Sequence, residues 1–349
     1  MSQLLVPYKS VSNSEFESTW ESPANIAFVK YWGKKGHQIP ANPSLSMTLS
    51  ECRTTTKTRF TPSDRLSVKL QFEGKSDLVF AAKIEKYILS LQEELPCLKN
   101  LSFDICTENT FPHGAGIASS ASGMSAFALT LANYLNFLSP DGDELLFLKR
   151  ASYLSRLASG SACRSVYGGF SHWGESEVEG ATDNYAVPFA VHKSLSMLHD
   201  TILVIDSSEK KVSSRMGHGL MSEHNFAESR FIQARQHFAI CFSALKSGDV
   251  ETLGNILESE ALSLHAMMLT SPDPYILMKG NTLLAIEAIW AFRRETKLPL
   301  FFTLDAGPNL HLIYPDSHGP KVIPFIREVL SAFSERIIFD HVGDRKSVV

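Results

Sequence analysis

The sequence predicts an α+β protein with two lobes. Stretches with the composition of strands and stretches with the periodicity of helices are mixed along the chain rather than alternating regularly, which favours α+β over a doubly wound parallel sheet. The 349 residues, 44% of them hydrophobic, are enough to build two packed lobes. We expect an arm at residues 1–22, a first domain at 23–194 and a second at 195–349, although no Pro/Gly linker marks the division near 190–200.

Strand-like and helix-like segments both follow from apolar spacing. Five stretches cluster or alternate apolar residues as strands do: 67–72, 101–106, 201–206, 300–305 and 309–314. The clearest helix is predicted at residues 121–137, where five apolar side chains fall on one face: Met124, Phe127, Ala128, Leu131 and Leu135. Four more helices are predicted from similar length and periodicity: 144–158, 223–246, 250–269 and 277–297.

Composition narrows the class of partner and the compartment. The formal net charge of -4 argues against a general nucleic-acid binder, yet it is compatible with a local basic pocket for an anionic metabolite. No apolar run approaches the roughly 20 residues that span a bilayer, and the first residues lack the features of a signal peptide. The five cysteines are scattered without a CxxC pair, which disfavours a disulfide framework or a zinc site. We expect a soluble, cytoplasmic protein that binds neither nucleic acid nor membrane.

A glycine-rich segment at residues 111–123, FPHGAGIASSASG, opens onto the first predicted helix. Gly114 and Gly116 would let backbone N–H groups approach an anion, and a helix N-terminus suits phosphate. Serine hydroxyls would add donors or a magnesium ligand, those of Ser119, Ser120 and Ser122. The alternative is a Gly/Ser turn with an ordinary serine N-cap. The segment matches neither a Walker A motif nor Gly-x-Gly-x-x-Gly, so a different phosphate-binding fold is needed.

Residues 22–35 join an apolar run to a cluster of cationic and aromatic side chains: Lys30, Tyr31, Trp32, Lys34 and Lys35. Lysine and tyrosine donors of this kind recognise phosphate, and the aromatic rings provide a rigid wall. The alternative is an exposed strand end with solvated lysines.

The turn at residues 158–165 is a second candidate anion site. Ser159, Ser161 and Arg164 would converge on a carboxylate or a phosphate, with arginine offering a bidentate fork. A surface arginine beside a Gly/Ser turn is the alternative.

Asp305 closes the strand predicted at 300–305, just before Ala-Gly-Pro. A carboxylate there would accept or orient a substrate hydroxyl proton. An Asx-turn that caps the bend explains the residue equally well.

Together these segments resemble the mevalonate diphosphate decarboxylases of the GHMP kinase superfamily. Five blocks carry the match in the family's order: NIAFVKYWGK at 25–34, NPSLS at 42–46, the glycine-rich loop at 111–123, SGSACRSVYGGF at 159–170 and TLDAGPN at 303–309. A sixth, VSSRMG at 212–217, looks like the family's segment near the substrate phosphates. Ala118 stands where the superfamily's kinases usually have Gly, as it does in the decarboxylases.

The resemblance implies a two-lobed fold and a two-stage reaction. The first lobe would be the GHMP-type ATP-binding domain, of the ribosomal protein S5 domain 2-like type, and the second would be a ferredoxin-like GHMP-type domain. A cleft between them would hold the substrate with ATP and Mg²⁺, and the protein would be a homodimer. ATP would phosphorylate the C3 hydroxyl of mevalonate 5-diphosphate. Loss of that phosphate builds positive charge on C3 while the C1 carboxylate leaves as CO₂, giving isopentenyl diphosphate.

The resemblance also implies roles for individual residues. The catalytic set would be Asp305, Arg164 and Lys30, with Asp305 acting as base or as orienting group at the C3 hydroxyl and Arg164 holding the C1 carboxylate. Substrate contacts are implied for Ala27, Tyr31, Lys34, Ser159, Gly160, Ser161, Arg164, Ser214 and Arg215. ATP contacts are implied for Pro112, His113, Gly114, Ala115, Gly116, Ile117, Ala118, Ser119, Ser120 and Ser122, and Ser120 is also expected to contact magnesium.

Two histidines depart from the family pattern. His218 stands where many members have Met, close to the substrate diphosphate, and His113 replaces a small residue in the phosphate loop. We interpret both as lineage variations, but His218 leaves open a family kinase or decarboxylase that acts on mevalonate or mevalonate 5-phosphate. A non-catalytic metabolite sensor is a further alternative, against which the joint presence of Asp305, Arg164 and Ser120 argues.

Overall fold

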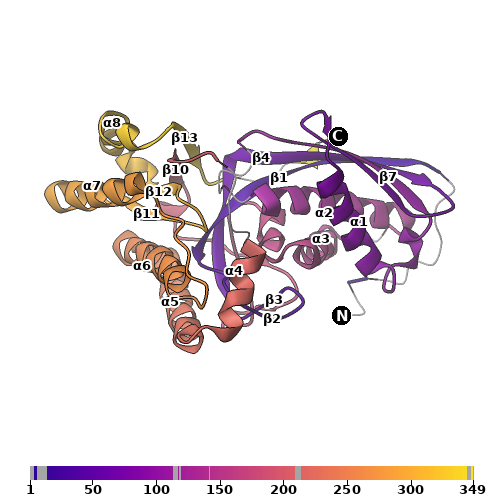
Figure 1. Ribbon diagram of the computed structural model, residues 1–349, viewed down its shortest axis with the longest axis horizontal. Helices are drawn as coiled ribbons and strands as arrows, with labels where there is room; N and C mark the ends of the chain where they lie inside the picture. Colours follow the sequence, from indigo (N-terminus) through magenta and orange to yellow (C-terminus); the bar gives the residue numbers. More distant parts are fainter. Residues whose placement is uncertain are drawn as a thin grey trace.

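The computed structural model describes residues 4–5, 14–112, 117, 119–140, 142–208, 214–343 and 347–348. Strands and helices are mixed along the chain and gather into two lobes, which confirms the predicted α+β class. Figure 1 shows the larger sheet with its helices on one side of the molecule and the helices α5 to α8 on the other.

The first lobe is built on an eight-stranded sheet with the order β14-β1-β4-β7-β5-β6, in which β8 pairs with β4 and β9 pairs with β8. Its strands are β1 (Phe16–Val29), β4 (Ser44–Pro62), β5 (Ser67–Phe72), β6 (Lys75–Ser76), β7 (Leu101–Asn109), β8 (Phe170–Trp173), β9 (Val187–Pro188) and β14 (Ser347–Val348). A separate hairpin joins β2 (Lys34–Gly36) to β3 (Ile39–Pro40). The strands predicted at 67–72 and 101–106 are confirmed as β5 and β7, which are parallel neighbours.

Of the two longest strands, β1 is predicted only through the apolar, strand-like run that begins at residue 22, and β4 is missing from the sequence prediction. In the second half of β4 three buried positions are occupied by Thr54, Thr56 and Thr58, so apolar alternation does not mark that half of the strand. Their hydroxyls are paired inside the lobe: Thr54 with Ser122 at 2.7 Å and Thr58 with Thr130 at 2.9 Å. The predicted arm at 1–22 is wrong at its end, because β1 begins at Phe16 and pairs with β4 from that residue onward.

Three α-helices cover one face of this sheet (Figure 1): α1 (Leu78–Leu91), α2 (Ser119–Leu138) and α3 (Glu144–Ala158). Helix α2 is buried along most of its length between the sheet and α3. Helix α3 has the predicted bounds because Asp143 caps it, accepting from the N–H groups of Leu145 and Leu146 at 2.9 and 3.1 Å. Helix α1 was not predicted.

The second lobe contains a four-stranded antiparallel sheet with the order β11-β12-β10-β13. Its strands are β11 (Phe301–Thr303), β12 (Leu310–Pro315), β10 (Leu198–Val204) and β13 (Arg336–His341). Its α-helices are α4 (Ser214–Leu220), α5 (Ala227–Ser247), α6 (Val250–Leu269), α7 (Gly280–Thr296) and α8 (Gly319–Glu328). Across both lobes, short 3₁₀ helices lie at Pro96–Leu98, Gly160–Val166, Lys193–Leu195, Met221–Glu223, Asp316–His318 and Leu330–Phe333.

Helix ends in this lobe follow local signals. Gly248, at φ +83°, closes α5 in the left-handed conformation, and Asp249 then caps α6, which has the predicted bounds. The helix predicted from residue 223 begins only at Ala227, because a 3₁₀ turn precedes it. The helix predicted from residue 277 begins at Gly280.

The lobes are joined at the edge where β13 meets β4. The carboxylate of Asp340 accepts hydrogen bonds from the backbone N–H groups of Ser50, Glu51 and Cys52 at 2.8–2.9 Å. The expected division near 190–200 falls between β9 and β10, while the domain limits themselves remain a prediction. Within the described ranges, no helix is both long enough and apolar enough to cross a bilayer.

Candidate active site

Lys30 and Asp305 form the centre of the site, although 275 positions separate them in the chain. Lys30 follows the end of β1, and Asp305 follows β11. Their Nζ and Oδ1 atoms are 3.0 Å apart, and Lys30 Nζ also donates to the carbonyl of Ala27 at 2.7 Å. The Lys30 side chain is 2% exposed and that of Asp305 is 28% exposed, so the carboxylate remains open to a ligand. Burial lowers the pKa of Lys30, and the Asp305 charge opposes that effect.

These contacts decide between the alternatives for Lys30, which is a buried, paired lysine rather than a solvated one, whereas Lys34 and Lys35 are exposed. The bend after Asp305 contains a backbone hydrogen bond, in which the Gly307 N–H donates to the Asp305 carbonyl at 2.7 Å. The Asp305 carboxylate accepts from Lys30 Nζ at 3.0 Å.

Arg164 enters the site from the 3₁₀ helix that follows α3 and is only 2% exposed, so the surface-arginine alternative is wrong. Its Nη1 donates to Ser44 Oγ at 2.5 Å and its Nε donates to Asn25 Oδ1 at 3.3 Å. Burial lowers the pKa of Arg164, and the Asp305 carboxylate is among the groups that raise it, so the two charges lie within interaction range. A buried guanidinium held by neutral oxygens is suited to a carboxylate ligand.

An aromatic wall stands beside this charged centre. Tyr31 packs edge-on against Trp173 at a centroid distance of 4.8 Å, and it packs against His218 at 4.4 Å with the two rings tilted by 45°. Gly160 lets Tyr31 approach, because a Cβ there would lie 2.7 Å from the tyrosine hydroxyl oxygen. Burial raises the pKa of Tyr31, so its hydroxyl stays protonated and able to donate. The exposed Lys34 ammonium donates to Gln38 Oε1 at 2.7 Å.

His218 is a neutral part of this wall. The Gly33 N–H donates to its Nδ1 at 3.0 Å, which puts the proton of the neutral ring on Nε2. Burial, with a smaller contribution from the Lys34 charge, lowers the pKa of His218 to about 3. The ring joins α4 to the turn after β1, a role that the sequence did not predict.

The predicted ATP loop is only partly within the described residues; His113, Gly114, Ala115, Gly116 and Ala118 lie outside them. On its flanks Pro112 is half-buried and Ile117 is buried. Ser119 and Ser120 form the first turn of α2, and Ser120 Oγ accepts from Lys83 Nζ at 3.3 Å. Lys83 lies on the unpredicted helix α1, which is why no sequence motif indicated it.

Ser122 does not fit the predicted ATP contact. Its side chain is fully buried, and its hydroxyl lies 2.7 Å from Thr54 Oγ1 on β4. One helical turn separates Ser119 from Ser122, but the second position faces the sheet instead of the helix N-terminus.

The remaining predicted substrate contacts come from two segments, the turn after α3 and the start of α4. Ser159 ends α3, and the carbonyl of Ser161 accepts from Asn25 Nδ2 at 3.4 Å, close to Arg164. Ser214 and Arg215 begin α4, the helix that carries His218, and their side chains lie outside the described structure. Substrate contact by these residues stays a prediction.

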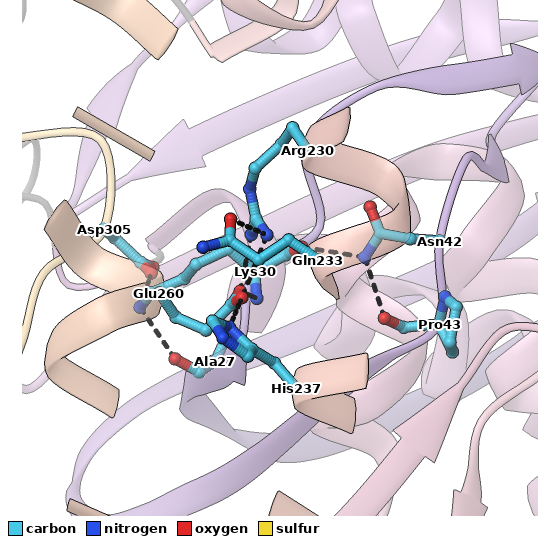
Figure 2. A network of polar contacts seen from close by, with 9 residues as sticks. All are labelled: Ala27, Lys30, Asn42, Pro43, Arg230, Gln233, His237, Glu260 and Asp305. Atoms are coloured by element: carbon cyan, nitrogen blue, oxygen red, sulfur yellow. Dashed lines mark hydrogen bonds and ion pairs between the residues drawn. The ribbon is translucent and has the colours of Figure 1, made fainter. Parts of the chain in front are cut away.

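A second layer of polar residues surrounds Lys30 and was missed by the sequence prediction. Figure 2 shows Glu260 beside Lys30, with Arg230 and His237 converging on its carboxylate. On the other side, Asn42 Nδ2 donates to the Lys30 carbonyl at 3.1 Å. A single glutamate on a helix carries no sequence signal for such a role.

Comparisons with known proteins agree with this arrangement. Two family models match: the diphosphomevalonate decarboxylase-like N-terminal domain over residues 22–186 and the mevalonate 5-diphosphate decarboxylase C-terminal domain over residues 201–346. The diphosphomevalonate decarboxylase of Ganoderma lucidum is 30% identical, over 90% of this chain and 82% of the relative. That of Saccharomyces cerevisiae is 31% identical, over 89% of this chain and 81% of the relative.

Solved structures give the same result. MDDEF in complex with MVAPP, AMPPCP and magnesium matches with a TM-score of 0.83 at 26% identity, covering 96% of this chain and 99% of that one. Mevalonate diphosphate decarboxylase from Staphylococcus aureus matches with a TM-score of 0.83 at 28% identity and the same coverage. The two-lobed fold implied by the sequence resemblance is thereby confirmed, and the chain belongs to the diphosphomevalonate decarboxylase family.

Proposed function

We propose that this chain catalyses the ATP-dependent decarboxylation of mevalonate 5-diphosphate to isopentenyl diphosphate, with release of ADP, phosphate and CO₂. The observation that carries the proposal is the pairing of Asp305 with the buried Lys30 at 3.0 Å, with a second buried cation, Arg164, near enough for the Asp305 charge to raise its pKa. A reaction that removes a proton from a hydroxyl and then expels a carboxylate needs both a carboxylate and a cationic anchor in one place.

Asp305 would act at the first step. The C3 hydroxyl oxygen attacks the terminal phosphorus of ATP, its proton passes to the Asp305 carboxylate, and ADP leaves with the electron pair of the broken P–O bond. Lys30 holds Asp305 from the buried side at 3.0 Å, leaving the carboxylate's exposed side for the substrate. Whether Asp305 takes the proton fully or orients the hydroxyl, the same geometry is required.

Arg164 would act at the second step. The C3–O bond breaks, the phosphate leaves with its electrons, and the C1–C2 bonding pair forms the C2=C3 double bond as CO₂ departs. Arg164 would hold the C1 carboxylate until that bond breaks, with Ser159 and Ser161 seating the substrate beside it. Its described hydrogen-bond partners are the neutral Ser44 and Asn25, so the guanidinium charge is not neutralised by a bonded carboxylate of the protein.

ATP would bind at the N-terminus of α2. Ser119 and Ser120 offer hydroxyl oxygens there, and Lys83 adds a cation 3.3 Å from Ser120. Oxygen donors of this type suit Mg²⁺, which would contact Ser120 and neutralise charge on the phosphates. The complex of MDDEF with AMPPCP and magnesium supports ATP and Mg²⁺ as ligands.

The diphosphate end would meet Tyr31, Lys34 and Arg215. The hydroxyl of Tyr31 stays protonated, and the exposed Lys34 can turn toward an anion. We further propose a cytoplasmic homodimer, which light scattering of the purified protein and fractionation of its source cells would test.

The function is tested by incubating the protein with ATP–Mg²⁺ and each of mevalonate, mevalonate 5-phosphate and mevalonate 5-diphosphate. We expect ADP, CO₂ and isopentenyl diphosphate from the diphosphate alone. ADP without CO₂ would indicate a kinase, and CO₂ from the monophosphate alone would contradict the substrate. Tight ATP binding without any turnover would favour the metabolite sensor.

A further inference from the structure

Glu260 holds the peptide of Lys30 from inside the protein. Its Oε2 accepts the Lys30 backbone N–H at 2.8 Å, and the carboxylate also binds both terminal nitrogens of Arg230 at 2.9 and 2.5 Å and His237 Nδ1 at 2.6 Å. Figure 2 shows this convergence on one carboxylate, with Lys30 between Glu260 and Asp305. Glu260 thus accepts from four donor atoms.

The chain topology explains why a charged acceptor stands there. Val29 is the last residue of β1 and pairs with Leu45, so the next N–H, that of Lys30, lies beyond the strand ladder. A buried N–H without a partner is costly, and Glu260 of α6 supplies one. Because Glu260 is 0% exposed, its own charge needs compensation, and α5 provides it from positions 230 and 237, which lie on one helical face.

As a result, the backbone N–H, the carbonyl and the ammonium group of Lys30 are all hydrogen-bonded. Glu260 holds its N–H, Asn42 holds its carbonyl at 3.1 Å, and its ammonium lies between the Ala27 carbonyl and Asp305. A buried lysine held at its backbone N–H, its carbonyl and its ammonium has little conformational freedom left, so it presents Nζ to Asp305 with a small further loss of entropy during the reaction.

We propose that Glu260 is a positioning residue for catalysis, which acts through Lys30 to hold the Asp305 carboxylate in its reactive orientation. The inference rests on the proposed function. Glu260 does not touch the substrate in this scheme. Its loss should therefore slow the chemical step without weakening substrate binding.

The same helix contains a matched control. Glu258, two residues away on α6, is also largely buried and also binds an arginine through both oxygens, Arg293 at 2.6 and 3.0 Å, together with Trp290 Nε1 at 2.8 Å. None of its described contacts is to Lys30 or Asp305. Replacing Glu258 by Gln therefore breaks a comparable buried ion pair away from the site.

The experiment compares Glu260→Gln, Glu260→Asp and Glu258→Gln with the unaltered protein. CO₂ release from mevalonate 5-diphosphate gives kcat and KM, and thermal unfolding identifies a temperature at which all variants are folded. For Glu260→Gln we expect kcat to fall about 10–100-fold with KM within threefold, since small displacements of reacting groups cost this much. Glu260→Asp keeps the charge but lacks one methylene of reach, so we expect a similar loss. Glu258→Gln should keep kcat within about twofold.

Equal kcat for the folded Glu260 and Glu258 variants would overturn the proposal, as would a loss confined to KM. If Glu260→Gln does not fold, Arg230→Lys keeps the charge and removes the fork, and its kcat should fall more than that of Glu258→Gln. Inactivity of the unaltered protein on all three substrates would instead refute the proposed function. In that case, crystal structures of the variants still test the positioning, by whether the Lys30–Asp305 distance increases from 3.0 Å.

Discussion

Two buried arginines, Arg230 and Arg164, differ in how their charge is met. Arg230, 4% exposed, has its fork closed by both oxygens of Glu260. Arg164, 2% exposed, is held by the neutral oxygens of Ser44 and Asn25, and within the described part of the chain no carboxylate hydrogen-bonds to it. A buried charge that the protein leaves without a bonded counter-ion is stabilised best when a ligand brings one.

The comparison teaches that the partners of a buried arginine, rather than its burial, distinguish a structural role from a chemical one. Both guanidinium groups are removed from water, so exposure alone does not distinguish them. Arg230 binds Glu260, which accepts the Lys30 backbone N–H, whereas under the proposed function Arg164 would hold the carboxylate that the reaction expels. The Asp305 charge acts on both Lys30 and Arg164.

The largest effect is expected on removing that central carboxylate. Asp305→Asn keeps the shape but cannot accept the hydroxyl proton, so kcat should fall about 10²–10⁴-fold. The Kd for mevalonate 5-diphosphate, measured by calorimetry, should change much less than kcat. A variant that retains turnover while losing affinity would place Asp305 in binding instead of chemistry.

Exchanging the two arginines for methionine should separate their roles. Arg164→Met is expected to lower kcat/KM about 10–150-fold, because a charge-assisted hydrogen bond to the substrate is worth roughly 1.5–3 kcal/mol. Its free energy of unfolding should change little, since no protein carboxylate loses its partner. Turnover assays and urea unfolding on the same preparation measure both.

Arg230→Met is the matched control, and it should show its main effect on folding. Leaving Glu260 buried without its arginine is expected to lower the free energy of unfolding by about 3–5 kcal/mol. Equal loss of stability in the two variants would show that Arg164 is as structural as Arg230.

A pH profile tests the electrostatic side of the comparison. Lys30 faces Asp305, Glu260 and Arg164; burial lowers its pKa, and the two carboxylates raise it. Removing the charge in Glu260→Gln should move the alkaline limb of kcat to lower pH, by an amount absent in Glu258→Gln. At a pH between the lowered pKa of Lys30 in the folded protein and its unfolded value of 10.5, the unfolded chain binds more protons at this residue than the folded protein does. The Lys30 contribution to the free energy of unfolding should therefore rise with pH in that window. An unmoved alkaline limb would mean that the limb does not report Lys30.

The smallest effect concerns His218, which lies in the wall beyond Arg164. Its pKa of about 3 is below the unfolded value of 6.5, so only the unfolded chain takes up its proton as pH falls from 6.5 towards 3, and the free energy of unfolding falls with it. His218→Asn can keep the acceptor for the Gly33 N–H and does not titrate. Between pH 7 and pH 5 it should lose about 1–2 kcal/mol less stability than the unaltered protein. His172, with a pKa lowered by burial to about 4, adds the same dependence in both proteins and cancels in the difference.

The sequence by itself determined the α+β class, the helices with strong caps and the order of the motifs. Asp143 and Asp249 act within one turn of their own helices, so α3 and α6 could be predicted with their observed bounds. Strand β4 could not, because its buried face carries threonines whose partners come from α2.

Only the tertiary structure decided which motif residues meet and what holds them. Lys30 reaches Asp305 across 275 positions, and Glu260 reaches the Lys30 backbone across 230. It also turned Ser122 towards β4 and made His218 a half-buried, neutral ring. The physical reason is the separation of the interacting residues along the chain. Helix caps and apolar periodicity depend on near neighbours in the sequence, whereas the partners of a buried charge come from distant segments that only folding brings together.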